Sequence, residues 1–319
     1  MFIRSKTLLI TILLISASLA QVAAVNESAG TTGFSALKIV YSARAMALGQ
    51  ALTGIAENPD GLHFNPAAVI RLENSEIGST YMNYFMDAQG GQVQYLMPRN
   101  KFIGWGFFMK YLNLGEMERT DVDASGNLIE SGETFGAYNF IAGATMSRYI
   151  SDAIDVGGTI KVIYDQIDDT SAAAMLLDIG VIHHPANEKV KVGVSARNIG
   201  RQISYYSDSE YSERLPLTFA AGLSYRFNER YFAMLDFSKA SGENFAAKMG
   251  LEYNLTPDLQ LRGGFRSNAA DWNNGGGLGL TSGISLGAGW NWHNYRIDYG
   301  ISSYGDLGLV NQVSLNYEF

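Results

Sequence analysis

The chain has 319 residues, of which 47% are hydrophobic and 17% charged, with a formal net charge of −8. The acidic balance and the lack of a basic stripe exclude a nucleic-acid partner, because phosphate recognition needs clustered Lys and Arg. The absence of Cys excludes a disulfide framework, a thiol nucleophile and a Cys-based metal site. The high Gly, Tyr and Phe content favours a chain of many strands and tight turns.

Residues 1–20 have the three-part layout of a secretory signal peptide. Arg4 and Lys6 precede a short apolar run, and Ala20 ends a cleavage site of small residues, with a second acceptable site ending at Ala24. An N-terminal membrane anchor is the alternative, but the run is shorter than the roughly 20 residues that a spanning helix needs. We therefore expect export, followed by an N-terminal segment over residues 21–73 and a main domain over residues 74–319.

Residues 43–70 fit no strand pattern. The first half is rich in Ala, Met and Leu, with Gly49 as a backbone break, which predicts a short helix or a compact turn in a close space. In the second half, Asn58 begins a turn sequence. Asn65 precedes Pro66, and this pair is typical of a capped helix start. Such residues can also do no more than shape a loop.

The same stretch resembles a known family. The run Ala36-Leu37-Lys38-Ile39, then Ala43-Arg44-Ala45-Met46 with Gly49, then Asn65-Pro66-Ala67 resembles the N-terminal signature of the PorV/PorQ outer-membrane barrels, relatives of FadL-type transporters of hydrophobic compounds. Family members usually continue Met-Gly-Gly-Ala after the arginine and end Asn-Pro-Ala-Gly, and this chain departs at Ala47 and Ala68. The resemblance implies a barrel of about fourteen strands closed by an N-terminal plug. Its plug and gating candidates are Arg44, Gly49, Asn58, Asn65 and Pro66.

From residue 75 onward, apolar residues recur at every second position for about ten residues, a turn follows, and the pattern repeats. Val162 and Leu177, for example, lie beside Lys161 and Asp178. Charges facing hydrocarbon would be costly, so we expect one face to meet lipid and the other a polar lumen. A soluble sheet with one wet face is the alternative. The lumen charges predicted in this way are Asp155, Lys161, Asp178, Asp236, Glu252, Arg262, Arg296 and Asp298.

If Arg44 lies in this lumen, we expect it to pair with a carboxylate or with backbone carbonyls, because an unpaired charge away from bulk water is costly. The candidate acids are Asp155, Asp178, Asp236, Glu252 and Asp298.

Short and long connections alternate along the strands. Short ones are expected near residues 98–100, 151–153, 185–187, 228–230, 256–258 and 292–294, and long ones near 113–135, 166–172, 200–214, 240–244, 268–277 and 304–308. This alternation is typical of an up-and-down barrel with short periplasmic turns and long outer loops. The predicted fold is therefore an all-β, transmembrane, antiparallel up-and-down barrel of about fourteen strands with a partly helical N-terminal plug.

The C-terminal strand supports export to the bacterial outer membrane. Leu315, Tyr317 and Phe319 alternate with polar residues and end the chain, and this arrangement resembles the signal that the outer-membrane assembly machinery reads. Expected partners are therefore outer-membrane lipid and that machinery.

No enzyme, metal or cofactor site is expected. His183 and His184 are neighbours on a strand and point to opposite faces, so they cannot chelate one ion. The stretch from Asp121 to Asn127 loosely resembles a calcium loop but lacks its final Glu, and a hairpin tip is the better interpretation.

Two functions follow from the resemblance. The first is a PorV-like barrel that serves protein secretion of the type IX kind, with secreted cargo proteins and secretion components as partners. The alternative is a FadL-like passive route for hydrophobic small molecules. A polar inner face weakly favours the secretion role over the hydrophobic route. A purely structural barrel is a third possible class of function.

Overall fold

The computed structural model describes residues 28, 30–56, 58–123, 125–268 and 279–319. The predicted signal peptide and the predicted loop over residues 268–277 lie almost wholly outside these ranges. None of the helices in the described part of the chain is long and apolar enough to cross a membrane.

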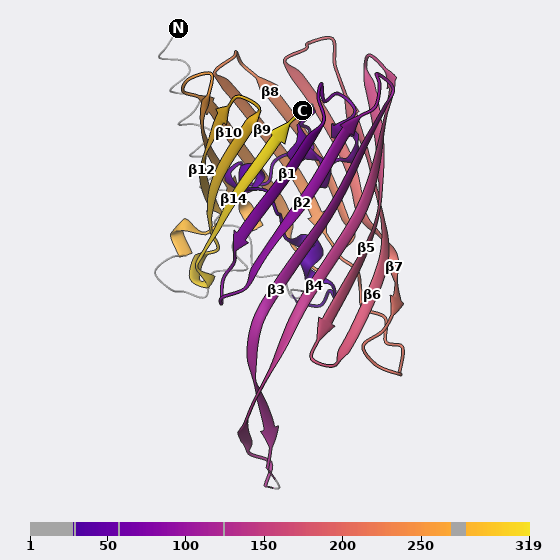
Figure 1. The fold of residues 1–319 in the computed structure, drawn as a ribbon, viewed down its shortest axis with the longest axis vertical. Coiled ribbons are helices and arrows are strands. Elements are labelled where there is room, and N and C mark those ends of the chain that lie inside the picture. Colours follow the sequence, from indigo (N-terminus) through magenta and orange to yellow (C-terminus); the bar gives the residue numbers. More distant parts are fainter. Residues whose placement is uncertain (1–27, 29, 57, 124, 269–278) are drawn as a thin grey trace.

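Fourteen antiparallel strands close into one barrel (Figure 1). Each strand pairs with its sequence neighbours, and β1 pairs with β14 to complete the circle. The predicted fold class is confirmed. The strands are β1 (Glu76–Asn83), β2 (Gln89–Pro98), β3 (Ile103–Val122), β4 (Leu128–Ser151), β5 (Ile154–Ile167), β6 (Thr170–His183), β7 (Val190–Ser204), β8 (Thr218–Arg226), β9 (Tyr231–Ala240), β10 (Phe245–Asn254), β11 (Leu259–Arg266), β12 (Ile284–Trp292), β13 (Tyr295–Ser303) and β14 (Leu309–Glu318).

The two faces of the wall differ as the alternation predicts. Val162 and Leu177 are 38% and 41% exposed on the outside, whereas Lys161 and Asp178 are 8% and 5% exposed on the inside. Because successive side chains of a strand point to opposite faces, this assignment extends along each strand. The outer face is a continuous apolar surface suited to hydrocarbon.

We expect Val162→Arg or Leu177→Arg to prevent assembly, because an Arg on the lipid face at mid-depth costs about 2 to 4 kcal/mol. Lys161→Ala and Asp178→Ala change the lumen and should still assemble. The measurement is the amount of heat-modifiable barrel recovered from membranes. Equal recovery of all four variants would contradict the assignment of the two faces.

The predicted loop over residues 113–135 is wrong for most of its length. The last residue of β3 that pairs with β2 is Asn113, and β4 pairs with β5 from Ala137 onward. Beyond these points β3 and β4 continue as a two-stranded ribbon that extends past the barrel (Figure 1), and its described residues pair with no other strand. β7 likewise runs to Ser204, into the predicted loop over residues 200–214. Residues 113–135 are mostly polar and charged, so the apolar alternation that marks the spanning strands does not mark this extension.

An aromatic belt surrounds the short-turn end of β12–β14 and β2. Trp292 stacks on Tyr295 with ring centroids 6.0 Å apart, and Tyr295 meets Tyr317 at 4.8 Å. Tyr317 contacts Phe319 at 5.0 Å, and Phe319 meets Tyr95 across the barrel closure at 6.4 Å. Aromatic belts of this kind lie at the membrane–water interface.

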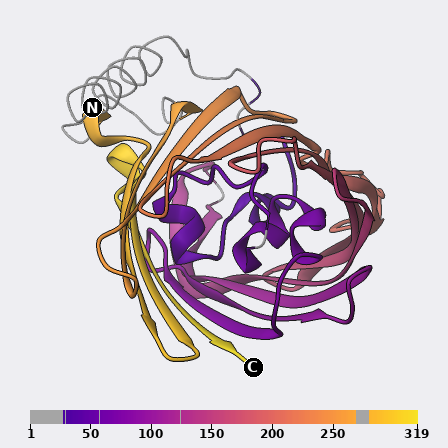
Figure 2. The ribbon, with the colours of Figure 1, turned by 90° about the horizontal axis from the view of Figure 1, so that it is seen from above.

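The described residues between 33 and 70, which precede β1, lie inside the barrel (Figure 2). They include the short helices η1 (Ser35–Lys38), α2 (Ala43–Ala47), η2 (Pro59–His63) and η3 (Pro66–Val69). Two further short helices, η5 (Gly279–Thr281) and η6 (Gly305–Leu307), flank β12 and β13. The N-terminal segment therefore forms a plug, defined here as residues 33–70.

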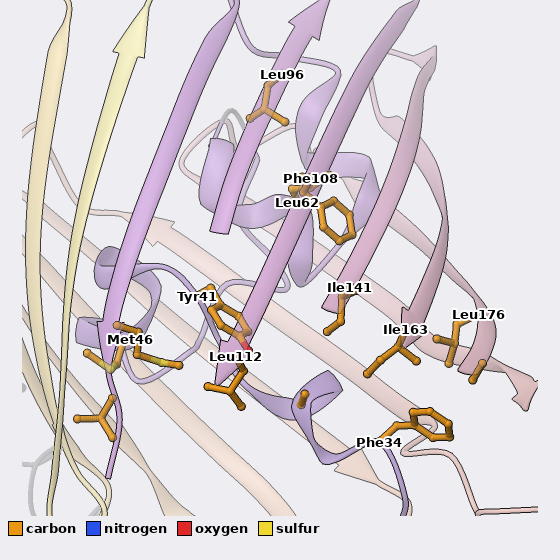
Figure 3. Close-up of a cluster of buried hydrophobic side chains, with 14 of the residues drawn as sticks. Phe34, Tyr41, Met46, Leu62, Leu96, Phe108, Leu112, Ile141, Ile163 and Leu176 are labelled. Carbon is orange, nitrogen blue, oxygen red and sulfur yellow. The ribbon is translucent and has the colours of Figure 1, made fainter. Parts of the chain in front are cut away.

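An apolar core joins the plug to the inner wall of β2–β6 (Figure 3). Plug side chains of Phe34, Tyr41 and Leu62 pack among wall residues that are almost fully buried. These wall residues are Leu96, Phe108, Leu112, Ile141, Ile163 and Leu176. The inner face of β2–β6 therefore carries these apolar side chains together with predicted polar ones such as Lys161 and Asp178, so the expectation of a polar inner face is incomplete for this part of the wall.

Candidate functional site

Two asparagines begin the short helices of the plug. Asn58 Oδ1 accepts from the Asp60 backbone N–H at 2.8 Å, and Asn65 Oδ1 accepts from the Ala67 N–H at 3.1 Å. Each cap is followed by a proline at the first helical position, where no N–H is needed. The predicted helix start at Asn65 and Pro66 is confirmed, and the turn sequence after Asn58 forms η2.

Asn65 also fastens the plug to the wall. Its side-chain amide is fully buried and donates to the carbonyls of Thr53 and Val181 at 3.0 Å and of Val194 at 3.3 Å. Val181 and Val194 belong to β6 and β7, so one side chain joins two strands to two parts of the plug. The family resemblance and the capping pattern both indicate Asn65 as a plug residue. Its hydrogen bonds to two wall strands could not be predicted from the sequence.

Glycines let the plug approach the wall at backbone distance. Gly49 has a φ of 62°, and a Cβ built on it would lie 2.6 Å from the carbonyl oxygen of Met249 and the amide nitrogen of Phe265. On the facing wall, a Cβ at Gly264 would lie 2.0 Å from the Gly49 nitrogen. A side chain at either position would push the plug away from β10 and β11.

A closed circuit of six charged residues, which we call the charge ring, ties the plug to the opposite half of the wall. Its members alternate in sign and are Arg44, Glu252, Arg262, Asp298, Arg296 and Asp60. Arg44 and Asp60 come from the plug, and the other four come from β10, β11 and β13. The ring lies near the ends of these strands that carry short turns, the periplasmic end of such barrels.

The geometry of the charge ring favours strong pairs. Arg44 makes a two-pronged contact with Glu252, with Nε to Oε2 at 2.9 Å and Nη2 to Oε1 at 3.0 Å. Arg262 bridges Glu252 at 2.7 Å and Asp298 at 2.5 Å.

Arg296 completes the ring. It donates to Asp298 at 2.9 Å and to Asp60 at 3.1 Å, and Arg44 Nη1 lies 3.9 Å from the same Asp60 carboxylate. Arg44 was predicted to meet an inward acid, and Glu252 was among the predicted partners. The turn sequence that contains Asp60 does not indicate its contacts with Arg44 and Arg296.

The other predicted lumen charges also have partners. Asp155 is fully buried and accepts from Arg71 at 2.5 Å and pairs with His184 at 2.6 Å. Lys161 donates to Asp178 at 2.6 Å. Asp236 accepts from the backbone N–H of Thr53 at 2.7 Å, which adds another link between wall and plug. The structure thus places all eight predicted lumen charges inside the barrel and joins four of them in the charge ring.

The two histidines and the hairpin tip that were considered as metal sites in the sequence are located as follows. His183 is exposed and His184 is buried, so the two rings lie on opposite faces. Within the described ranges no cluster of three or more potential metal ligands occurs. Asp123 accepts from the backbone N–H groups of Asn127 at 2.9 Å and Ser125 at 2.8 Å, and these bonds, first those from Asn127, lower the pKa of its carboxyl. It thus shapes the tip of the β3–β4 ribbon.

A cavity of about 410 Å³ lies between the plug and the wall. Its apolar lining combines aliphatic residues with aromatic ones such as Tyr84, Phe85 and Phe108. Its charged lining, among the described residues, consists of six cationic side chains and two acidic ones: Lys38, Lys110, Lys161, Arg197, Lys248, Arg266, Asp178 and Glu243. Lys110 lies over the rings of Tyr41 and Phe108, 5.3 Å from each centroid. Apolar side chains of such a cavity can hold the body of a small molecule, and the charged and polar side chains among them can fix its orientation.

We expect Asn65→Ala to loosen the plug, because the change removes the cap of η3 and leaves buried carbonyls without a donor, at about 1 to 3 kcal/mol. The chain contains no Cys, so Ala68→Cys, at a buried plug position, gives a single labelling site. Labelling by a water-soluble maleimide should be slow in the parent and faster with Asn65→Ala. Asn74→Ala, whose amide bonds to Glu318 at the exposed rim, is the control and should leave labelling slow. Equal rates in all three proteins would show that Asn65 does not hold the plug.

Comparison with solved structures identifies the class of fold. The chain is similar to the toluene transporter TbuX of Ralstonia pickettii, with a TM-score of 0.63 and 11% identity over 88% of this chain and 98% of that one. It is also similar to the toluene transporter TodX of P. putida, with a TM-score of 0.63 and 12% identity, and to a FadL homologue of Pseudomonas aeruginosa, with a TM-score of 0.57 and 12% identity. Each match covers 88% of this chain and 98% of the other.

The fold is therefore that of FadL-like outer-membrane barrels. No protein-family model matches the sequence, and no curated protein matches it either.

Proposed function

We propose that this protein is a plugged outer-membrane channel for small hydrophobic molecules, similar in role to the FadL-like transporters whose fold it shares. The observation that carries the proposal is the cavity between the plug and the wall, whose lining includes aromatic and aliphatic side chains. The apolar part of the inner face of β2–β6 supports the same role, because it offers a contact surface to a hydrophobic solute. The plug then closes the barrel until solute enters.

Uptake of toluene by cells that express the protein tests this function. Uptake should exceed that of cells with an empty vector, and Ala246→Trp should abolish the excess, since Ala246 is buried and lines the cavity. Ala144→Trp, on the exposed face of β4, should have no effect. Uptake equal to the empty vector would reject a hydrocarbon channel, provided that the protein fractionates with outer membranes and migrates on gels in a heat-modifiable way.

The β3–β4 ribbon favours a second candidate, the PorV-like secretion role. Residues 113–136 contain six acidic residues and one basic residue. In the part of the ribbon that the structure describes, neither edge pairs with a further strand beyond Asn113 and Ala137. Such a ribbon can receive a strand of a basic exported protein by edge pairing. Shortening the ribbon by removing residues 116–133 should leave toluene uptake intact and abolish co-purification of exported proteins. Unchanged co-purification would remove this candidate.

A further inference from the structure

A groove of about 720 Å³ lies on the wall across β5–β10, and its bulky side chains face outward. Phe219, Phe237 and Phe245 stand along it and are 43–59% exposed, and Phe237 and Phe245 stack with centroids 5.8 Å apart. Val181 and Val194 line the groove on the neighbouring strands. We call this feature the outer groove. It is separate from the cavity inside the barrel.

Small residues create the outer groove. On the paired strands β7 and β8, Ala196 lies opposite Phe219 and Ala221 lies opposite Val194. The two alanines are therefore diagonal neighbours on the outer face, and bulkier side chains surround them. Behind them the inner face carries glycines: a Cβ at Gly180 would lie 2.0 Å from Asn65 Oδ1, and one at Gly222 would lie 2.7 Å from the Gly54 nitrogen. Plug and wall touch directly here. The groove is therefore backed by a packed layer and does not open into the lumen at these positions.

Among the described residues that line the outer groove, Lys239 carries a charge. Lys239 is exposed, and it lies next to the end of β9 at Ala240, on the side of the long connections. Its ammonium group donates one hydrogen bond to the backbone carbonyl of Glu243, which leaves two donors for another acceptor. A Lys near the end of a membrane-spanning strand can place its ammonium group at the membrane–water interface while its aliphatic stem lies along the apolar surface.

We propose that the outer groove is a binding site for a membrane lipid with a negatively charged headgroup. One acyl chain fills the groove over Ala196 and Ala221, between the phenylalanines, and the headgroup meets Lys239. The apolar lining matches the chain, and the ammonium matches the headgroup charge. Any hollow on the outer face of a membrane barrel is filled by lipid chains. A specific site differs because it binds an anionic lipid more tightly than a neutral lipid. The proposal does not depend on the transport function.

Native mass spectrometry of the full chain in detergent tests the site, with phosphatidylglycerol and phosphatidylcholine of identical acyl chains as probes. The wild type should bind its first phosphatidylglycerol about fivefold more tightly than phosphatidylcholine, as expected for one Lys near a lipid headgroup. Lys239→Gln should remove this preference and keep binding of one lipid. Ala221→Phe should weaken the first binding event for both lipids, because it fills the groove.

Ala144→Phe is the matched control, since Ala144 is exposed on the outer face of β4 and is not part of the groove. It should bind lipid as the wild type does, and heat-modifiable migration shows that each variant is folded. Equal affinity of wild type and Lys239→Gln for phosphatidylglycerol would overturn the headgroup assignment. If Ala221→Phe binds its first lipid with the affinity of the wild type, the groove is not the lipid site. If the wild type is a dimer that Ala221→Phe dissociates, a second copy of the chain covers the groove, and the lipid site is likewise overturned.

Discussion

Removal of residues 33–70 is expected to convert a closed barrel into a conducting one. The plug occupies the lumen, with α2 against β12–β14 and η3 against β4–β6. Every strand of the wall pairs with two other strands, and none pairs with the plug. The shortened chain therefore retains every hydrogen-bonded strand pair of the barrel. We therefore expect the variant to insert and to lose its closed state.

Single-channel conductance in planar bilayers measures this change. The wild type should show almost no conductance, and the deletion variant should show long-lived open events. Removal of residues 116–133 from the β3–β4 ribbon is the control, because it shortens the chain outside the barrel and should leave the channel closed. Identical conductance of wild type and plug deletion would show that the plug does not close the lumen.

A substitution within the charge ring should have the largest effect of any single change. Glu252→Gln leaves Arg44 and Arg262 facing each other without the carboxylate that both contact. Loss of one partner of a buried ion pair costs about 3 to 5 kcal/mol, and here the side chains of all three residues are at most 12% exposed. The free energy of unfolding, followed by tryptophan fluorescence in urea, should fall by this amount.

The double variant Arg44→Leu with Glu252→Leu separates charge imbalance from general disruption. It removes one positive and one negative charge, so Arg262 retains Asp298 and the lumen stays balanced. We expect it to be more stable than Glu252→Gln, since replacing a buried pair by apolar side chains is often neutral. Glu318→Gln, at an exposed position, should have little effect. A double variant no more stable than the single one would show that the ring does not act through charge pairing.

Strand alternation was sufficient to predict the barrel, because one face must meet lipid and a shift by one residue exchanges the two faces. Lys161 and Asp178 followed directly from this rule. Partners were harder to predict. Arg44 had five candidate acids, and only the register between β10 and β11 brings Glu252 and Arg262 together to receive it.

Other features depend on the closed barrel itself. Phe108 and Leu112 alternate toward the lumen like Lys110, yet their burial depends on plug residues distant in sequence. Gly180 and Gly222 look like ordinary strand glycines until the plug is placed against them. The outer groove likewise arises where two alanines from different strands become neighbours, and a single strand pattern does not contain that information.

The pairing of β1 with β14 has a consequence for the rate at which the protein forms. Eight residue pairs join the two strands, and the hydroxyl groups of Thr80 and Ser314, 234 residues apart in the chain, lie 2.7 Å from each other. Contacts between such distant segments form late, because the entropy of closing the intervening chain must be lost first. Until they form, two strands have free backbone groups that hydrocarbon cannot satisfy. The slowest step of biogenesis should therefore be the meeting of the two ends, and substitutions at Thr80 or Ser314 should delay maturation more than they weaken the finished barrel.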